Sequence, residues 1–201
     1  MSNNQKGLLI VFSGPSGAGK GTVLRRLMQL DKRLYYSVSA TTRPPRAGET
    51  DGVHYHFMDK EAFLKEVRQG RMLEYAEYCG NYYGTPAPAV DERLAEGRDV
   101  LLEIDVQGAR QVREKRPDAV MIFVAPPSFE ALCQRLTGRG TEPLDVVKKR
   151  LEKARYEMSL AGEYDYVVIN DKVGRAARDV EAILRAEKRR AGRMLAYIKG
   201  E

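Results

Sequence analysis

The sequence contains few residues of the kinds that build disulfides or metal centres. Two of its 201 residues are cysteines and two are histidines. Cys79 and Cys133 lack metal-like spacing and have no histidine nearby, so we expect reduced, structural thiols in a cytoplasmic protein without a secretion signal. For His54 and His56 we favour strand residues over metal ligands, because no third ligand stands at a suitable spacing.

Long hydrophobic runs are also missing, since none approaches the ~18 apolar residues that a membrane span requires. The sequence shows no repeats and no low-complexity linker, and its length suits one compact domain. The formal net charge is +6, and residues 174–201 carry eight Lys or Arg against four Asp or Glu, which is +4 of that total. No aromatic residue interleaves with these cations before Tyr197, so we favour a solvated helix face over a nucleic-acid surface. We expect neither a membrane nor a nucleic acid as partner, and the oligomeric state stays open.

Short apolar runs alternate with helical patterns along most of the chain. The runs that look like buried parallel strands are Leu8–Ser13, Leu34–Ser39, Val100–Asp105, Ala119–Ala125 and Tyr166–Asn170. The helical patterns cover residues 19–30, 86–96, 107–115, 128–138, 143–162 and 174–198. This alternation predicts an α/β fold with a doubly wound, parallel, five-stranded sheet.

Two segments interrupt the alternation. Residues 40–85 carry strand signals at Tyr55–Met58 and Met72–Tyr78, a helical pattern at Lys60–Gln69 and a turn at 81–85, which together indicate an inserted subdomain. Residues 126–158 begin at a Pro-Pro pair and are rich in Arg and Lys, which suggests a polar helical flap. We therefore predict a single domain, 1–201, whose core comprises residues 1–39, 86–125 and 159–201.

A glycine-rich turn follows the first apolar run and precedes a helical pattern. Gly14-x4-Gly19-Lys20 fits the first seven positions of the phosphate-loop pattern, and Gly21 stands where that pattern has Ser or Thr. The glycines let successive backbone N–H groups curl around an anion, while the helix N-terminus and the lysine add positive charge. Strand, glycine-rich loop and helix together predict a site for nucleotide phosphates.

Acidic residues end the apolar run at 100–105. In phosphate-loop enzymes an acidic residue at this place orders Mg²⁺ and its waters beside the phosphates. An Asp at a strand end can also be a turn or cap residue, but the phosphate loop favours the functional interpretation. Strand alternation puts Glu103 and Asp105 on the same face, so which of them organises the metal stays open.

Arginines stand in both interrupting segments. Arg135, Arg139 and Arg150 lie in the flap, whose closure would bring planar cations to developing negative charge. The alternative for these three is a solvated basic surface. The polar loop at 41–49 holds Arg43 and Arg46, three residues apart, and suits a second anion.

Eight motifs follow one another along nearly the whole chain. They are SGPSGAGKGT at 13–22, SVSATTRPPRAGE at 37–49, GVHYHF at 52–57, GNYYGTP at 80–86, LLEIDVQGA at 101–109, FVAPPS at 123–128, RLTGRG at 135–140 and VIND at 168–171. In this order they resemble the guanylate kinase family, nucleoside monophosphate kinases that make GDP from GMP and ATP. The resemblance implies a P-loop fold in which 40–85 binds GMP, 126–158 forms the lid and Mg²⁺ accompanies ATP.

The resemblance also implies roles for individual residues. ATP would contact Gly14, Pro15, Ser16, Gly17, Ala18, Gly19, Lys20, Gly21, Thr22 and Asn170. GMP would be held by Ser39, Arg43, Arg46, Tyr55, Glu74, Tyr83, Thr85 and Asp105, of which Ser39, Glu74 and Thr85 would read the base. The catalytic residues would be Lys20, Arg43, Arg135, Arg139, Arg150 and Asp105. Mg²⁺ would be held by Asp105 through water, with Thr22 as a further candidate.

The sequence departs from many family members at three positions. Gly21 replaces a frequent hydroxyl residue, Ala40 stands where many members have Ser, and Thr85 stands where Ser is frequent. A kinase for another small phosphate acceptor, such as a ribose phosphate, is one alternative, but it would not need the three base-reading residues together. A peptide-binding scaffold related to guanylate kinases is another, but such scaffolds have usually lost the phosphate loop or the lid arginines. We expect an ATP:GMP phosphotransferase that also accepts dGMP and works by positioning and charge neutralisation.

Overall fold

A parallel five-stranded sheet forms the centre of the molecule. The computed structural model describes residues 6–137 and 144–199. The strands are β1 (Leu9–Ser13), β2 (Tyr35–Tyr36), β7 (Val100–Glu103), β8 (Val120–Ala125) and β9 (Tyr166–Ile169), in the order β2-β7-β1-β8-β9. Every pairing between neighbours is parallel, which confirms the predicted sheet.

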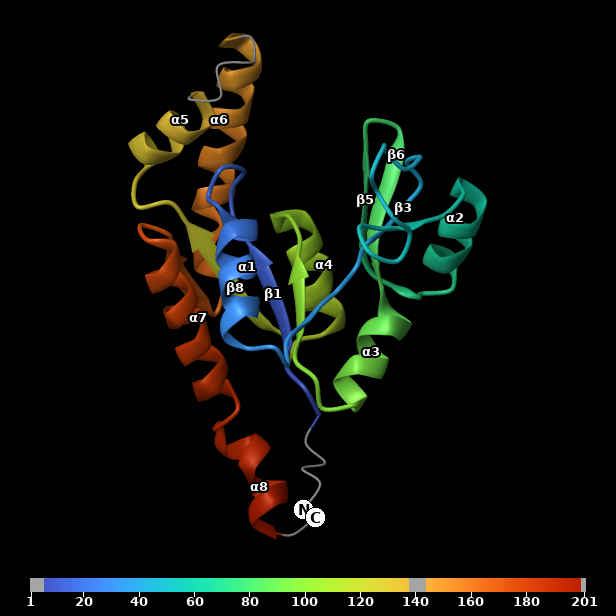
Figure 1. Ribbon diagram of the computed structural model, residues 1–201, viewed down its shortest axis with the longest axis vertical. Coiled ribbons are helices and arrows are strands. Elements are labelled where there is room, and N and C mark those ends of the chain that lie inside the picture. The colour runs from blue at the N-terminus through green and yellow to red at the C-terminus, as the bar shows by residue number, and fades with distance from the viewer. Residues whose placement is uncertain (1–5, 138–143, 200–201) are drawn as a thin grey trace.

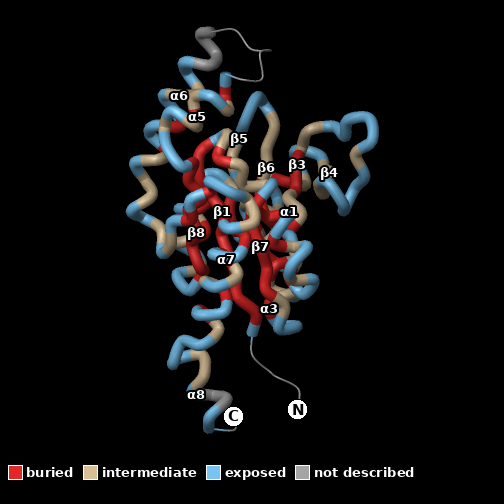
Figure 2. Tube along the Cα trace, turned by 60° about the vertical axis from the view of Figure 1, so that its left-hand side comes forward, coloured by how far each residue is buried: buried red, intermediate tan, exposed pale blue. Residues whose placement is uncertain are grey.

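Helices cover both faces of this sheet, which explains the nearly continuous apolar strands. Ile10 and Phe12 of β1 point into a cluster with α1 (Lys20–Leu30) and α7 (Val173–Glu187). Leu9 and Val11 point to the other face, where α3 (Ala87–Ala95) and α4 (Val106–Lys115) pack. Because successive side chains alternate between faces, a strand covered on both faces must be apolar throughout. Figure 2 shows that β1, β7 and β8 are coloured as buried along most of their length.

A second sheet stands beside the carboxyl ends of the central strands (Figure 1). It consists of β3 (Ala40–Thr41), β4 (His56–Phe57), β5 (Met72–Tyr78) and β6 (Asn81–Pro86), in the order β4-β3-β6-β5. The helix α2 (Lys60–Arg68) covers it through Phe63, which is fully buried against Ala40 and Met72.

The turn predicted at 81–85 is wrong, because these residues form β6. The chain reverses two residues earlier, at Cys79 and Gly80, whose φ angles are 50° and 73°. Two central residues with positive φ are typical of the tight hairpin turn that matches the twist of antiparallel strands. A Cys in the first position hides this signal, since Asn or Asp is usual there. Of the two histidines expected in strands, His56 lies in β4, whereas His54 lies in the preceding turn.

Two helices extend beyond the carboxyl end of the central sheet on the other side. The helices α5 (Phe129–Thr137) and α6 (Leu144–Ser159) pack through Leu132, Leu136 and Ala154. The Arg155 guanidinium also lies over the Phe129 ring, 4.2 Å from its centroid. A short 3-10 turn, η1 (Ala161–Glu163), leads from α6 to β9. Figure 1 shows the carboxyl end of the central sheet between this helical pair and the second sheet.

The helix predicted over 174–198 is two helices, α7 and α8 (Ala191–Lys199). At the break, the buried carboxylate of Glu187 accepts a hydrogen bond from the Tyr166 hydroxyl and pairs with Arg190. Lys188 pairs with Asp99, which stands just before β7. The break therefore coincides with side chains that contact residues of the core. Helical periodicity in the sequence cannot reveal such contacts. Within the described ranges, no helix has the length and apolarity needed to cross a bilayer.

Candidate active site

The glycine-rich loop joins β1 to α1 at the switch point of the sheet, where β1 has β7 on one side and β8 on the other. Ligands of doubly wound folds bind outside the carboxyl ends of the strands at such a point. Gly14 has a φ of 138°, and a Cβ there would lie 2.2 Å from the Val124 carbonyl oxygen. A Cβ on Gly19, with a φ of 86°, would lie 2.5 Å from Asn170 Nδ2. Both positions therefore require glycine.

The loop lysine folds back over the loop. Lys20 Nζ donates to the carbonyl oxygens of Gly14, at 2.6 Å, and Pro15, at 3.2 Å. Burial lowers the pKa of its ammonium group, and the carboxylates of Glu103, Glu157 and Asp105 oppose that shift. No acidic residue occupies the first turn of α1, so the positive end of the helix dipole is not neutralised there. The loop thus offers an ammonium group and the positive end of a helix dipole to an anion.

Two carboxylates approach the loop from the end of β7. Asp105 caps α4, and its Oδ1 accepts from the amides of Gln107 and Gly108 at 3.0 and 2.9 Å. Glu103 Oε2 accepts from the Tyr36 hydroxyl at 3.4 Å, and a Cβ on Gly21 would lie 3.5 Å from that same oxygen. Mg²⁺ prefers oxygen ligands and keeps several waters, so this donor set fits it. Thr22, the further candidate, is exposed on α1, where its Oγ1 accepts from Arg25 at 3.5 Å.

The arginine-bearing loop of the second sheet forms a compact charged cluster. Arg43 Nη2 pairs with Glu49 Oε1 at 2.8 Å, and the Arg46 amide donates to Glu49 Oε2 at 2.7 Å. These hydrogen bonds, that from the Arg43 side chain first, lower the pKa of Glu49 to about 2. The Arg43 guanidinium lies 5.4 Å from the centroid of the Tyr55 ring, which in turn meets the Tyr83 ring edge-on. The Arg46 residue itself is exposed.

A buried carboxylate lies at the opposite end of this sheet. Glu74 is only 7% exposed, and the Thr85 hydroxyl donates to its Oε1 at 2.6 Å. Burial raises the pKa of Glu74 to about 7 and the nearby Asp105 adds to the rise, whereas Thr85 and Lys115 oppose it. The hydroxyl proton of Thr85 is thus directed at Glu74.

A cavity of about 700 Å³ connects these groups. Its lining includes Ser39, Tyr55, Glu74, Tyr83 and Asp105. An adjoining cavity of about 420 Å³ is lined by Lys20 and shares Ser39, Tyr55 and Asp105 with the first. Together they run from the buried carboxylate to the glycine-rich loop, in the size range of ligand pockets. Thr85 lies behind Glu74 and is not among the lining residues.

The helical pair reaches the loop from above. Arg135 of α5 donates to the carbonyl oxygens of Asn170, at 2.9 Å, and Ala18, at 3.3 Å. Arg150 of α6 donates to Ser16 Oγ at 3.1 Å. Buried Asn170 also donates from Nδ2 to Ala18 at 2.7 Å. Three of the predicted site residues, Arg135, Arg150 and Asn170, therefore converge on one loop. Arg139 lies outside the residues that the structure describes.

Two site residues of α6 escape prediction from the sequence. Glu157 is 4% exposed, and its carboxylate opposes the lowering of the Lys20 pKa. Lys153 lines the larger cavity. They form an i,i+4 ion pair at 3.7 Å, and such spacing usually indicates a solvated helix face. No local signal distinguishes this pair from its exposed neighbours.

Comparisons with known proteins identify close relatives. The family model described as Guanylate kinase matches residues 6–187. The guanylate kinase of Lactococcus lactis is 54% identical over 191 residues, covering 95% of this chain and 93% of the relative. That of Streptococcus pneumoniae is 55% identical over 183 residues, covering 90% and 88%. The crystal structure of guanylate kinase from Anaplasma phagocytophilum superposes with a TM-score of 0.74 at 35% identity, covering 94% of this chain and 90% of that one.

Proposed function

The chain belongs to the guanylate kinase family, and we propose that it transfers the γ-phosphoryl group of ATP to GMP or dGMP, giving ADP and GDP or dGDP. It is thus an enzyme, an ATP-dependent nucleoside monophosphate kinase. The observation that carries the substrate assignment is the buried carboxylate of Glu74, in a cavity that continues to the lysine of a phosphate loop.

Guanine matches this carboxylate chemically. Its N1–H and its exocyclic amine are two donors on one edge, and a carboxylate accepts from both at once. Adenine presents an acceptor at N1 and would leave the buried charge of Glu74 unpaired. Ser39, which also lines the cavity, has a hydroxyl that can donate to the guanine O6 atom. We assign Thr85 to support of Glu74, since its hydroxyl proton already serves that carboxylate.

Arginine and tyrosine side chains of the second sheet would bind the phosphate of GMP. Arg43 lies between the Tyr55 ring and Glu49, so its guanidinium is oriented before substrate arrives. The Arg46 guanidinium and the Tyr83 hydroxyl are the further donors that we assign to this phosphate. A phosphate dianion competes with Glu49 for Arg43 through bidentate hydrogen bonds.

The chemical step needs positioning and charge neutralisation rather than a general base, because the attacking phosphate oxygen is already anionic. Lys20, Arg135 and Arg150 would move their hydrogen bonds from oxygens of the loop and of Asn170 to the triphosphate. We also assign Arg139 to this group. Bound Mg²⁺ would neutralise charge on the phosphates, and Glu103 and Asp105 would hold it through water. Exclusion of water would then favour transfer to GMP over hydrolysis.

These assignments imply a division of the chain into three functional parts. We propose that residues 40–85 bind GMP, that 126–158 act as a lid, and that 1–39, 86–125 and 159–201 form the core. The separate second sheet and the α5–α6 pair, on either side of the cavities, support this division. A cytoplasmic location suits an enzyme that consumes ATP and GMP, and Cys79 and Cys133 are both free thiols.

A coupled ADP-release assay tests the proposal. With ATP and Mg²⁺, we expect turnover of GMP and dGMP and at least ~10⁴-fold lower kcat/KM for AMP, because a site built on polar matching rejects unpaired groups strongly. UMP and ribose 1,5-bisphosphate serve as further acceptors. Glu74→Gln should lower kcat/KM for GMP by at least ~10²-fold while the KM for ATP stays within a few fold. Preferred turnover of ribose 1,5-bisphosphate, or unchanged GMP kinetics in Glu74→Gln, would overturn the assignment.

A further inference from the structure

One edge of the second sheet lies against α4, a helix that covers the central sheet. β5 is the last strand in the order β4-β3-β6-β5, and it packs against α4. The side of α4 that meets β5 carries Gly108, Gln111 and Lys115. These positions recur at the three- and four-residue spacing of one helix face.

Gln111 acts as a substitute for a neighbouring strand. Its Nε2 donates to the Tyr75 carbonyl oxygen at 2.9 Å, and its Oε1 accepts from the Tyr75 amide at 3.1 Å. Both backbone groups of an edge-strand residue are thereby satisfied by one side-chain amide. Tyr75 directly follows Glu74, so Gln111 fixes the backbone beside the base-reading carboxylate.

Gly108 lets that carboxylate lie directly on the helix. A Cβ at this position would stand 2.8 Å from Glu74 Oε2 and 3.3 Å from both Cδ and Cγ of the same side chain. Glycine is unfavourable inside a helix, so close packing is the physical reason for its presence here. The other oxygen, Oε1, accepts from Thr85. Contacts on both sides therefore set the plane of the carboxylate.

We propose that Gly108 and Gln111 are positioning residues for guanine recognition, which hold Glu74 so that both of its oxygens meet the donor edge of the base. The proposal rests on the proposed function and extends it to two residues that act through Glu74, of which Gln111 also lines the larger cavity. Its most sensitive consequence is discrimination between GMP and IMP, because hypoxanthine has N1–H but lacks the exocyclic amine. A displaced carboxylate first loses its contact with the exocyclic amine, which IMP lacks. The kcat/KM for GMP therefore falls more than that for IMP.

The first experiment compares Gly108→Ala with Gly174→Ala. Gly174 lies in α7, where an added Cβ meets nothing within 4 Å, so this variant controls for a helical glycine replaced by alanine. We expect Gly108→Ala to raise the KM for GMP and to lower the GMP-to-IMP ratio of kcat/KM, each by at least about tenfold. The KM for ATP should stay unchanged, and Gly174→Ala should resemble the wild type. A purely structural role predicts no change in the ratio.

The second experiment replaces Gln111 by Met, which keeps the length of the side chain and removes both hydrogen bonds. Arg116→Met is the matched control, because it removes the contact of Nη2, at the C-cap of the same helix, with both carboxylate oxygens of Asp91 in α3. Both variants should lose thermal stability, but only Gln111→Met should lower the GMP-to-IMP ratio. This variant keeps the proposal testable if Gly108→Ala does not fold.

The outcomes are distinguishable. A lower GMP-to-IMP ratio in Gln111→Met, with normal KM for ATP, supports the positioning role. An unchanged ratio in a folded Gln111→Met variant, or an equal loss in Arg116→Met, overturns it. A wild-type protein that phosphorylates neither GMP nor IMP would overturn the proposed function itself, and that result is visible before any variant is made.

Discussion

At the scale of single residues, the candidate site pairs a partly buried ammonium group with a buried carboxylate. Lys20 is held by loop carbonyl oxygens and Glu74 by a hydroxyl group. Burial lowers the pKa of Lys20 and raises that of Glu74, so it favours the neutral form of each. In the proposed function, a nucleotide supplies a partner for each charge. Its phosphates would complement the ammonium group, and its guanine donors would complement the carboxylate.

Replacement of the lysine should stop turnover without unfolding the protein. Lys20→Ala removes a charge aimed at the transferring phosphoryl group, so we expect kcat to fall by about 10²–10³-fold or more. Lys20→Arg should not restore activity, because guanidinium and ammonium differ in shape and reach. Steady-state kinetics together with thermal unfolding check this. A Lys20→Ala variant that keeps more than about a tenth of wild-type turnover contradicts the role.

Protonation of Glu74 should make GMP binding depend on pH. The folded-state pKa of about 7 lies above the ordinary Glu value of 4.5, so this group contributes stability below pH 4.5 that is lost as the pH rises through 7. Folding favours the protonated form of Glu74, whereas GMP binding favours the ionised form, because the two guanine donors need the ionised carboxylate. We therefore expect GMP binding at pH 7 to release about half a proton from this group and to strengthen toward pH 8.

Calorimetry in two buffers with different ionisation enthalpies measures this proton release. Glu74→Gln is the control, since it retains only the contribution of the GMP phosphate itself. The charges that face Glu74 are Asp105 and Lys115, both associated with α4, and neither is altered in this control. Equal proton release by the two proteins would show that Glu74 is already ionised.

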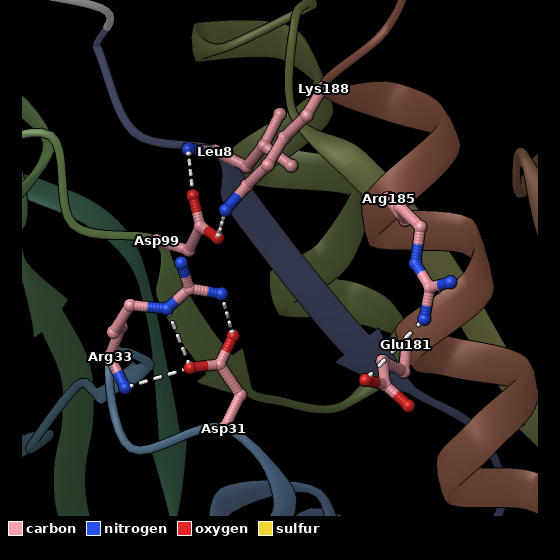
Figure 3. A network of polar contacts seen from close by, with 7 residues as sticks. All are labelled: Leu8, Asp31, Arg33, Asp99, Glu181, Arg185 and Lys188. Carbon is pink, nitrogen blue, oxygen red and sulfur yellow. Dashed lines mark hydrogen bonds and ion pairs between the residues drawn. The ribbon is translucent and has the colours of Figure 1, made fainter. Parts of the chain in front are cut away.

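At the scale of elements, contacts between distant segments decide where helices and strands end. The break between α7 and α8 falls where Lys188 reaches Asp99, and Figure 3 shows this pair beside the more exposed Asp31–Arg33 pair. Asp99 is 5% exposed and also accepts from the buried Leu8 amide at 3.0 Å. This one carboxylate connects the start of β1, the start of β7 and the end of α7.

Removal of that carboxylate should destabilise the whole fold. Asp99→Ala leaves the Leu8 amide buried without its side-chain acceptor and Lys188 without its partner, so we expect a loss of about 2–3 kcal/mol. Arg33→Ala is the control, because its 83% exposed side chain forms a surface pair worth less than about 1 kcal/mol. Denaturant unfolding of the two variants checks the difference. Equal losses would show that Asp99 is no more than a surface partner.

At the scale of the molecule, the site lies where three parts meet. The second sheet carries the carboxylate that we assign to base reading, the central sheet carries the loop, and the α5–α6 pair brings two arginines to that loop. None of these parts contains a complete site. Catalysis therefore depends on their relative placement, which closure around both substrates would complete.

Arg150 tests this dependence. Because its guanidinium already reaches the loop at Ser16, Arg150→Met should lower kcat by about 10²–10³-fold and change each KM by only a few fold. Lys149→Met, an exposed neighbour on α6, should leave both parameters near the wild type. Initial-rate kinetics with both substrates varied give the answer. A change confined to KM would show that Arg150 binds only the ground state.

The sequence by itself determined the central architecture and the phosphate loop. An apolar run, a Gly-x4-Gly-Lys turn and an amphipathic helix are local patterns, and each needs only its own neighbours to form β1, the loop and α1. The continuous apolar strands likewise predicted a sheet covered on both faces, because burial on two faces removes the alternation of polar residues. The motif resemblance predicted that Glu74, Asp105 and the arginines belong to the site, and these assignments stay predictions.

Only the tertiary structure decided how these residues are supported. The strand β6 forms because β5 and β3 pair with it, and the hydroxyl of Thr85 serves Glu74 because the two strands bring them together. Gln111 and Glu157 look like ordinary polar helix residues until the elements pack. Tyr75 and Lys20, the partners that bring them to the site, lie 36 or more residues away. Sequence periodicity indicates which face of a helix is buried, not which distant atom that face will meet.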